Sequence, residues 1–456
     1  MPFDLIIRNG TLVRESMVAR GDVAVEDGQI VQIVPELFAT AREIIDATGL
    51  HIFAGMIDPH VHFNEPGRTD WEGISSGSAA LAAGGGTCFF DMPLNSSPPV
   101  LTADAFKEKR GLAEHKSLTD FAIWGGLTPL NLHLMDELAA CGIVGFKAFM
   151  SNSAMSEFPH VDDLTLLEGM QRAARLGLPV AVHAENETIT AGLTSRAMIE
   201  GRTSARDFLA SRPPIAELEA IERAIAFAAE TRCSLHIVHV STGAGASAVF
   251  SARENDVDVT CETCPHYLLL TDIDAAELGP IAKCAPPLRS AGEVQGLWTQ
   301  LAGDEISFVA SDHSPSPPHM KDTDDWFSAW GGIPGCQTTL EALLAAGYEQ
   351  DRLTLQRITE LTSSAVARRF NLPNKGKLAP GYDADLTLVD LTAARRLERD
   401  DLYYRHRATP YLKHALNLTG RVKRTLLRGR TIFLNGDVTH DPHGRLVKPQ
   451  AKERSR

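Results

Sequence analysis

Long apolar runs are absent from this sequence. No stretch approaches the roughly 18 consecutive apolar residues that a membrane-spanning helix needs, so we expect no membrane partner. The first ten residues, MPFDLIIRNG, lack the basic start and long apolar segment of a signal peptide. Cysteine is scarce, with seven residues in a chain of 456. An odd number spread this thinly argues against a disulfide framework, and we expect a cytoplasmic protein.

Positive charge is also in deficit. Lysine and arginine total 44 against 58 aspartates and glutamates, which gives a formal net charge of −14. Nucleic-acid binding needs a basic surface, so we expect no nucleic-acid partner. The apolar share of 44% and the charged share of 22% are typical of a globular protein and exclude disorder over most of the chain. Histidine, in contrast, is plentiful, with 16 residues, several of them at short spacings.

Apolar strands alternate with amphipathic helices through the middle of the chain. Such an alternation predicts a parallel sheet and the α/β class. About eight strands over roughly 320 residues favour a closed (β/α)8 barrel. A doubly wound open sheet is the alternative, but it usually has a glycine-rich turn after its first strand, where this chain has histidines and carboxylates. We expect strands at residues 52–63, 87–92, 120–124, 142–149, 179–183, 234–240, 258–263 and 306–311, and helices at residues 73–83, 164–176, 216–230 and 338–346.

Both ends of the chain have the pattern of short hairpins. We expect turns at Asn9-Gly10, Asp27-Gly28 and Arg428-Gly429, each next to short apolar runs. Neither end is long enough to bury a good core alone, so we predict that they pair into one β domain. Its residues are 1–54 and 376–456, and the barrel spans residues 55–375. We expect the basic tail from Lys448 onward to be solvated.

The first predicted barrel strand ends in Asp58-Pro59-His60-Val61-His62. Residues two apart in a strand share a face, so His60 and His62 point together. Barrel enzymes carry their catalytic groups at this end of the strands. Two neutral imidazoles on one face suit zinc or a similar metal. Two ordinary hydrogen-bonded histidines are the alternative.

Later strands end in the same way, which favours the metal hypothesis. One strand leads to His183, another to His239, and a third to Ser311-Asp312-His313. His236 lies three residues before His239, and residues three apart in a strand point to opposite faces. We therefore assign His239 to the site and His236 to packing.

Lys147 lies inside the apolar segment Gly145-Phe146-Lys147-Ala148-Phe149. Burying a cation without a partner is energetically unfavourable, so a lysine in this segment is expected to have a partner or a modification. An ion pair or a snorkelling side chain is one interpretation. Carboxylation by CO2 is the other, because the resulting anion offers two oxygens to two metals. With four histidines and one aspartate, it would hold two divalent ions about 3.5–4 Å apart.

Eight segments of the chain together resemble the cyclic amidohydrolases, and most closely the allantoinase branch of that family. The resemblance covers nearly the whole chain. It implies a (β/α)8 barrel beside a β-sandwich made from both chain ends. It also implies a binuclear metal centre with the matching ligands His60, His62, carboxylated Lys147, His183, His239 and Asp312. The segments are HVHFNEPGRTDWEG (residues 60–73), DMPLNSSPP (91–99), GFKAFMSNS (145–153), AVHAEN (181–186), HIVHVS (236–241), ETCPHY (262–267), APPLR (285–289) and SDHSP (311–315).

Two positions narrow the expected substrate. Asn64 stands where dihydroorotases of this family have an arginine for a substrate carboxylate, and asparagine offers only neutral hydrogen bonds. Asn152 stands where hydantoinases and dihydropyrimidinases have a tyrosine, and it suits a hydantoin ring with a ureido arm. The expected substrate is thus a cyclic ureide, allantoin, with Asn64, Asn95, Asn152 and Ser314 as candidate substrate contacts.

The resemblance further implies a homotetramer with two divalent ions per chain. Zn²⁺ is the expected metal, with Co²⁺, Fe²⁺ and Mn²⁺ as alternatives. Asp312 is expected to be both a ligand and the catalytic proton carrier. A hydantoinase or dihydropyrimidinase and a non-catalytic metal-binding scaffold are the competing functions.

Four further features have less specific interpretations. Cys261 and Cys264 have the spacing of a metal or redox pair, but no second pair follows, and we expect a structural role. Arg68 is expected either to bind substrate or to pair with Glu65 or Glu72. Residues 326–335 are expected to contact the substrate through their backbone or to form a lid. Lys321 is expected to be solvated.

Overall fold

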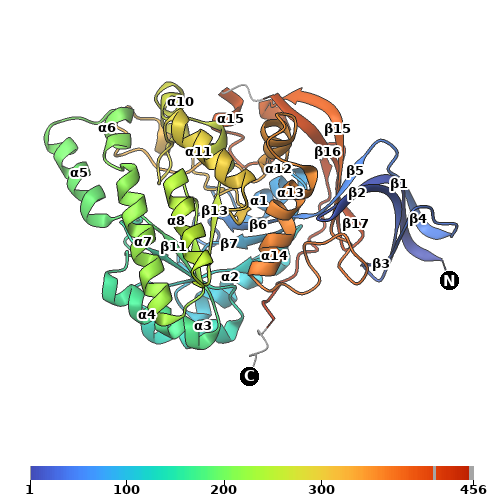
Figure 1. Cartoon of the computed structure of the whole chain (residues 1–456), viewed down its shortest axis with the longest axis horizontal. Coiled ribbons are helices and arrows are strands. Elements are labelled where there is room, and N and C mark those ends of the chain that lie inside the picture. The colour runs from blue at the N-terminus through green and yellow to red at the C-terminus, as the bar shows by residue number, and fades with distance from the viewer. Residues whose placement is uncertain (1, 414–416, 451–456) are drawn as a thin grey trace.

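Parallel strands form a closed barrel at the centre of the molecule. The computed structural model describes residues 2–413 and 417–450 (Figure 1). One parallel sheet has the order β6-β7-β8 and a second the order β14-β13-β12-β11-β10-β9, with β8 and β9 as two pieces of one strand interrupted at Trp124. A parallel bridge between Val61 and His313 joins the first strand to the segment after the last and closes the barrel. These strands are β6 (Met56–Val61), β7 (Gly86–Asp91), β8 (Asp120–Ile123), β9 (Gly125–Gly126), β10 (Phe146–Phe149), β11 (Val180–His183), β12 (Leu235–Ile237), β13 (Val259–Thr263) and β14 (Phe308–Val309).

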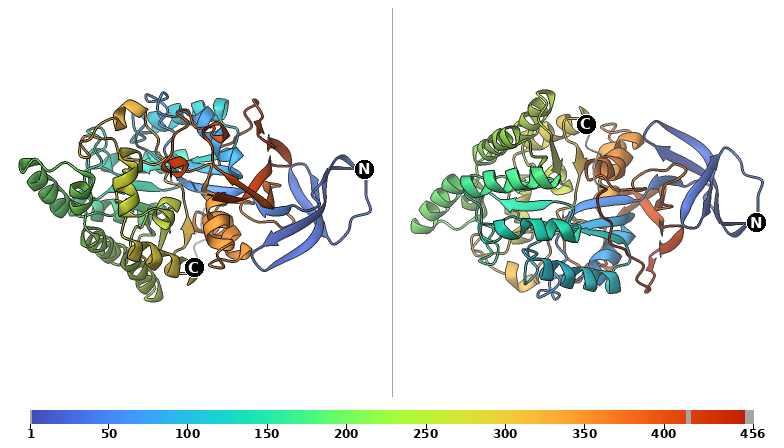
Figure 2. Two further views of the ribbon diagram at one scale, coloured as in Figure 1. Left: turned by 90° about the horizontal axis from the view of Figure 1, so that it is seen from above. Right: turned by 90° about the horizontal axis from the view of Figure 1, so that it is seen from below.

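Helices pack around the outside of the barrel (Figure 2). Local signals fix their ends: Asp162 caps α4 by accepting from the Thr165 amide at 2.8 Å, and Gly177 ends that helix with φ of 70°. In the described part of the chain, no helix is both long and apolar enough to cross a membrane. The helices are α1 (Ile74–Ala83), α2 (Ala103–Lys116), α3 (Met135–Cys141), α4 (Asp163–Leu176), α5 (Glu187–Ile199), α6 (Ala205–Ala210), α7 (Pro214–Thr231), α8 (Gly243–Glu254), α9 (Pro265–Leu269), α10 (Asp272–Leu278), α11 (Ala291–Ala302), α12 (Thr339–Leu343), α13 (Leu355–Thr359), α14 (Ala365–Arg369) and α15 (Pro410–Lys413).

Both ends of the chain contribute to one nine-stranded sheet beside the barrel. Its order is β18-β17-β16-β15-β5-β1-β2-β3, and β4 also pairs with β1. Figure 1 shows the N-terminal strands in blue next to the C-terminal strands in red. Tight turns at Asp27-Gly28 and Arg428-Gly429, both with positive φ, connect neighbouring strands as expected. The strands are β1 (Phe3–Arg14), β2 (Met17–Glu26), β3 (Gln29–Val34), β4 (Ala41–Asp46), β5 (His51–Ala54), β15 (Leu386–Arg396), β16 (Asn417–Leu427), β17 (Arg430–Leu434) and β18 (Asp437–Val438).

Two strand predictions were wrong in the same region. Asn9-Gly10 is not a turn but an irregularity within β1, where the register against β2 shifts and Asn9 has φ of 62°. The single strand expected at residues 52–63 is two strands, β5 in the terminal sheet and β6 in the barrel. The break falls at Gly55, where an added Cβ would lie 2.3 Å from Oγ1 of Thr87. The backbone must pass the barrel closely there, which only glycine permits.

A buried ion cluster joins the barrel to the terminal sheet. Nζ of Lys375 lies 2.5 Å from Asp120 of the barrel strand β8 and 2.7 and 2.8 Å from Asp385 and Asp383 before β15. Arg428, in the turn after β16, adds a second cation on Asp120 at 2.5 Å. Burial disfavours the charge, but the three carboxylates outweigh burial and raise the pKa of Lys375 well above its ordinary value. These aspartates bind side-chain cations, so their grouping is not evidence for a metal.

Candidate metal centre and active site

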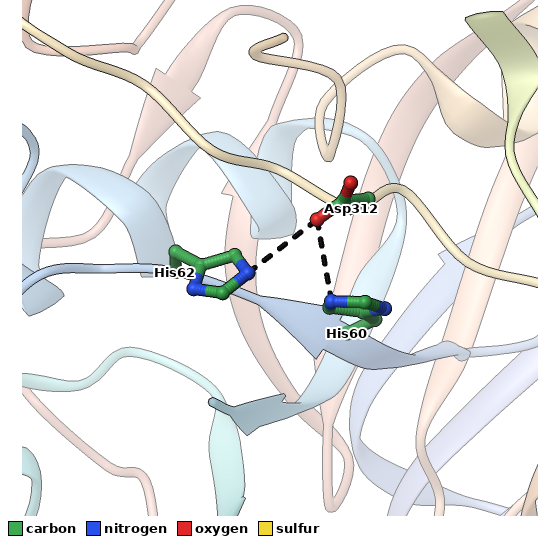
Figure 3. Close-up of side chains that lie close together, drawn as sticks. All are labelled: His60, His62 and Asp312. Carbon is green, nitrogen blue, oxygen red and sulfur yellow. Dashed lines mark ion pairs between the residues drawn. The ribbon is translucent and has the colours of Figure 1, made fainter. Parts of the chain in front are cut away.

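Three predicted ligands meet where the barrel closes. Nε2 of His60 and Nε2 of His62 lie 3.2 and 3.4 Å from the same oxygen, Oδ1 of Asp312 (Figure 3). All three residues are buried. One ligand atom from each lies within 4.8 Å of the others, so the group can hold a metal ion.

A second pair of predicted ligands lies next to the first group. Nδ1 of His183, at the end of β11, is 3.1 Å from Nε2 of His239, which follows β12. The rings of His60 and His239 are 5.5 Å apart between centroids. Two clusters of ligand nitrogens therefore face one another across the end of the barrel.

Lys147 is fully buried on β10, and its amine has no hydrogen-bond partner among the described residues. Burial lowers the pKa of Lys147 to about 8, although Asp312 and Glu262 act in the opposite direction. A lysine with a lowered pKa has more of the neutral amine that reacts with CO2. The unpaired amine and the surrounding nitrogen and oxygen donors fit a metal centre bridged by a modified lysine.

Two of these ligands have strained backbone. His239 has φ of 40° and Asp312 has φ of 43°, a region that side chains other than glycine rarely adopt. Such strain persists only where the surrounding structure imposes it, and it is frequent at active sites. Both residues follow the end of a strand, and the positive φ changes the direction of the side chain there. The alternation of side chains along a strand therefore does not predict where these two residues point.

Glu262, which sequence reasoning did not single out, orients the first ligand. Its Oε1 lies 2.5 Å from Nδ1 of His60, and its Oε2 lies 3.1 Å from Nε2 of His236. A carboxylate at this position favours the tautomer of His60 with its proton on Nδ1, which leaves Nε2 to face the site. The packing role expected for His236 was incomplete: it stacks on Phe308 at 4.9 Å and also binds Glu262. The sequence signal that could have identified Glu262 is a carboxylate inside the segment that forms the buried strand β13.

The other ligands are oriented by similar contacts. Nε2 of His183 lies 2.8 Å from Oε2 of Glu185, which also pairs with Arg212. Burial would raise the pKa of Glu185, but Arg212 and His183 outweigh burial and lower it to about 2. Nδ1 of His62 faces the carbonyl of Leu94 at 3.2 Å. In each case the second ring nitrogen is engaged and the first is directed at the site.

Asp58 ties the two edges of the barrel together below the ligands. Its Oδ1 accepts from the amides of Ser311 and His60, at 3.1 and 3.3 Å. Burial raises the pKa of Asp58 to about 6. Asp58 therefore acts on the site by holding the strand ends that carry His60 and Asp312.

A cavity of about 520 Å³ opens over the four histidines and Asp312. Three of the candidate substrate contacts, Asn95, Asn152 and Ser314, line its wall. Asn64 is buried outside the lining, and its amide donates to the carbonyl of Pro315 at 3.3 Å. The structure thus brings three of the four side chains to the cavity and puts the fourth behind it.

Residues 327–332 line one side of the cavity. Gly332 has φ of 135°, and an added Cβ would lie 2.3 Å from the carbonyl oxygen of Ser314. Lys321 was wrongly expected to be solvated: its amine donates to the carbonyls of Trp330 and Gly332, both at 2.9 Å. This lysine holds the segment from outside the cavity.

Two other expectations have a clear outcome. Arg68 pairs neither with Glu65 nor with Glu72 but with Glu157, at 3.0 Å. Cys261 and Cys264 are buried free thiols, in agreement with a structural role. The predicted solvated tail is described only to Gln450, whose amide binds the carbonyl of Asn371, and residues 451–456 lie outside the described part.

Comparison with known proteins places this geometry in a family. A model of the Amidohydrolase family matches residues 51–432. The chain is 55% identical to an allantoinase of Rubrobacter xylanophilus over 454 residues, covering 100% of this chain and 99% of that one. It is 54% identical to an allantoinase of Solibacter usitatus, covering 98% and 97%. Among solved structures, an L-hydantoinase (dihydropyrimidinase) from Arthrobacter aurescens has a TM-score of 0.95 at 34% identity, covering 98% and 100%.

Proposed function

We propose that this chain, which belongs to the amidohydrolase family, hydrolyses the hydantoin ring of allantoin to allantoate, a step in purine degradation. One observation carries the reaction class: the amine of Lys147 is buried without a hydrogen-bond partner among the described side chains, and it interacts electrostatically with His60, His183, His239 and Asp312. The substrate follows from the relatives, because proteins named allantoinase match over nearly the full length.

We infer that the ligand set holds two divalent ions. His60 and His62 would hold one ion, His183 and His239 would hold the other, and Asp312 would complete the set. CO2 adds to the neutral amine of Lys147: an N–C bond forms, a proton leaves, and the carbamate offers two oxygens. Zn²⁺ suits these ligands, with Co²⁺, Fe²⁺ and Mn²⁺ as alternatives. Such ions supply a Lewis acid for the ring carbonyl and an acidified water with a pKa of about 7.

Asp312 is the proton carrier in this mechanism. Its Oδ1 lies close to the Nε2 atoms of His60 and His62 on the cavity floor. The carboxylate accepts a proton from the attacking water and delivers it to the ring nitrogen as the carbonyl C–N bond breaks. One water is consumed, and the ring amide becomes a carboxyl group and a terminal ureido NH2.

The ring is bound by neutral polar groups. Asn95, Asn152 and Ser314 line the cavity and offer amide and hydroxyl hydrogen bonds to its carbonyls and N–H groups. Asn64 supports the segment at Pro315 from behind the wall. The lack of a cation at Asn64 disfavours a ring that bears a carboxylate, such as dihydroorotate.

A hydantoinase or dihydropyrimidinase is the second candidate, because the solved structures of this shape carry those names. Asn152 in place of the expected tyrosine disfavours it. A non-catalytic scaffold is the third, and the complete ligand set disfavours that function.

We further propose a homotetramer in the cytoplasm. The family resemblance supports the assembly, and seven free cysteines support a reducing compartment. Sedimentation of the purified protein tests the assembly, and a dimer or monomer at working concentration contradicts it.

Metal analysis followed by a substrate panel tests the function. We expect two divalent ions per chain and the highest kcat/KM on allantoin in a panel with hydantoin, dihydrouracil and dihydroorotate. Faster cleavage of dihydrouracil than of allantoin supports the second candidate. No turnover of any cyclic amide by the metal-loaded protein supports the scaffold.

A further inference from the structure

Two cations line the cavity in addition to the predicted metal ligands. Lys283, which is 7% exposed, and Arg212 both belong to its wall. They flank one aromatic ring: Nζ of Lys283 lies 4.7 Å and the guanidinium of Arg212 5.7 Å from the ring centre of Phe208. Both side chains therefore converge on one part of the cavity, which has no role in the mechanism above.

Each cation has donors to spare. The amine of Lys283 has three N–H groups and, among the described residues, donates to the carbonyl of Ala329. Arg212 pairs with Glu185 through Nη1, but its buried Nε has no hydrogen-bond partner within the described residues. A ligand group that accepts hydrogen bonds would satisfy these donors.

Acceptors lie beside these donors. Asp325 lines the same cavity and attracts the charge of Lys283. The charge of Arg212 is balanced by Glu185. Because Glu185 pairs with Arg212 and Asp325 attracts the charge of Lys283, this part of the cavity suits a neutral group with both a carbonyl and N–H donors, rather than an anion. An alkyl or aryl group would bury two cations against apolar surface, which is costly.

The group that fits this description on the proposed substrate is the exocyclic ureido arm of allantoin. We propose that Lys283 and Arg212 form a ureido subsite, in which Lys283 donates to the carbonyl oxygen of the arm and thereby sets the preference for allantoin over hydantoin. The inference rests on the proposed function, because hydantoin has the same ring and lacks the arm.

The ratio of kcat/KM for allantoin to kcat/KM for hydantoin tests the subsite. Lys283→Met keeps the length of the side chain and removes its donors. We expect the ratio to fall about 10- to 100-fold, the range for a lost hydrogen bond from a charged group. Lys283→Gln keeps N–H donors without the charge, and we expect an intermediate ratio, which also serves if the methionine variant does not fold.

Lys321→Met is the matched control. Lys321 also donates to carbonyls of the segment at residues 330–332, but it does not line this cavity. If Lys283 merely holds that segment, both lysine variants will lower kcat/KM for allantoin and for hydantoin by the same factor. The ratio is then unchanged, which overturns the subsite. A wild-type ratio in both Lys283 variants overturns it too. If the wild-type enzyme opens hydantoin but not allantoin, the proposed function is contradicted, and the ureido subsite is contradicted as well.

Discussion

The carboxylate of Glu262 lies 2.5 Å from Nδ1 of His60, and both side chains are almost completely buried. This contact fixes which nitrogen of His60 is available to a metal. Carboxylates in this position commonly change metal affinity by about 10- to 100-fold when they are removed.

Glu262→Gln is therefore expected to weaken metal binding about 10- to 100-fold while the protein stays folded. The amide cannot accept the proton of Nδ1 with a full negative charge. Metal retention during dialysis against a chelator measures the effect. Glu157→Gln, on a half-exposed carboxylate that pairs with Arg68, is the control. Equal metal retention in both variants would contradict the role of Glu262.

Lys147→Ala is expected to lose metal and activity, because the proposed bridging carbamate could not form on alanine. A short carboxylic acid such as acetate, added in excess, is expected to restore part of both. Lys109→Ala removes another buried lysine, one that is paired with Asp91 at 2.5 Å, and should cost stability without emptying the metal centre. Two metals per chain and a full rate in Lys147→Ala would show that no carbamate bridges the ions.

Asp312→Asn is expected to keep much of the metal and to lose about 10²- to 10⁴-fold in kcat on allantoin, the usual contribution of a positioned acid–base group. The amide oxygen still offers a ligand, but it cannot carry the proton to the leaving nitrogen. Metal content and kcat should be measured on the same sample. Near-normal kcat with two metals bound would exclude this residue as the proton carrier.

Gly332→Ala is expected to lower kcat/KM for every substrate and to destabilise the protein by about 1–3 kcal/mol. The new Cβ would meet the carbonyl oxygen of Ser314, and φ of 135° is strained for alanine. Gly331→Ala is the matched control, because nothing lies within 4 Å of its added Cβ. Thermal melts and substrate kinetics of the pair should differ, and identical behaviour would contradict the close approach.

Lys375→Met is expected to lower the free energy of unfolding by about 3–5 kcal/mol. The substitution leaves three carboxylates near one another, with Arg428 as the remaining cation of the described cluster. The contribution of Lys375 is fully present below its ordinary pKa of about 10.4 and is lost only as the pH rises toward the higher pKa of the folded state. Stability curves at pH 7 and pH 9 should therefore show the same deficit. Lys107→Met, in an exposed pair with Asp104, should leave the free energy of unfolding nearly unchanged.

The sequence was sufficient to predict that the candidate ligands lie together, because one rule covers them. Parallel strands bring their carboxyl ends to one edge of a barrel, so His60, His183 and Asp312 could be grouped although they are far apart in the chain. The same rule does not reach His239, because β12 ends at Ile237 and the backbone turns before His239; the assignment of His236 to packing agrees with its stacking on Phe308 but missed its contact with Glu262. Alternation holds only while a strand continues.

The remaining parts of the cavity depend on tertiary contacts. Lys283 and Arg212 come from loops, whose positions no periodic pattern predicts. Asn9-Gly10 has the composition of a turn, but pairing with β2 and β4 on either side keeps β1 one continuous strand with an irregularity at Asn9. Only the neighbouring strands reveal which of two locally reasonable conformations the chain adopts.

The closure of the barrel between Val61 and His313 has a consequence for how the protein is made. His60 and Ser311, which touch across this seam, are separated by 251 residues of chain. At about 5–20 residues per second, a ribosome needs about 10–50 s to travel from one to the other. The nascent protein therefore carries His60 and His62 without Asp312 until almost the whole barrel has been synthesised. Lys147, His183 and His239 join them during that interval, so the predicted ligand set is complete only when Asp312, the last of the six, has been synthesised.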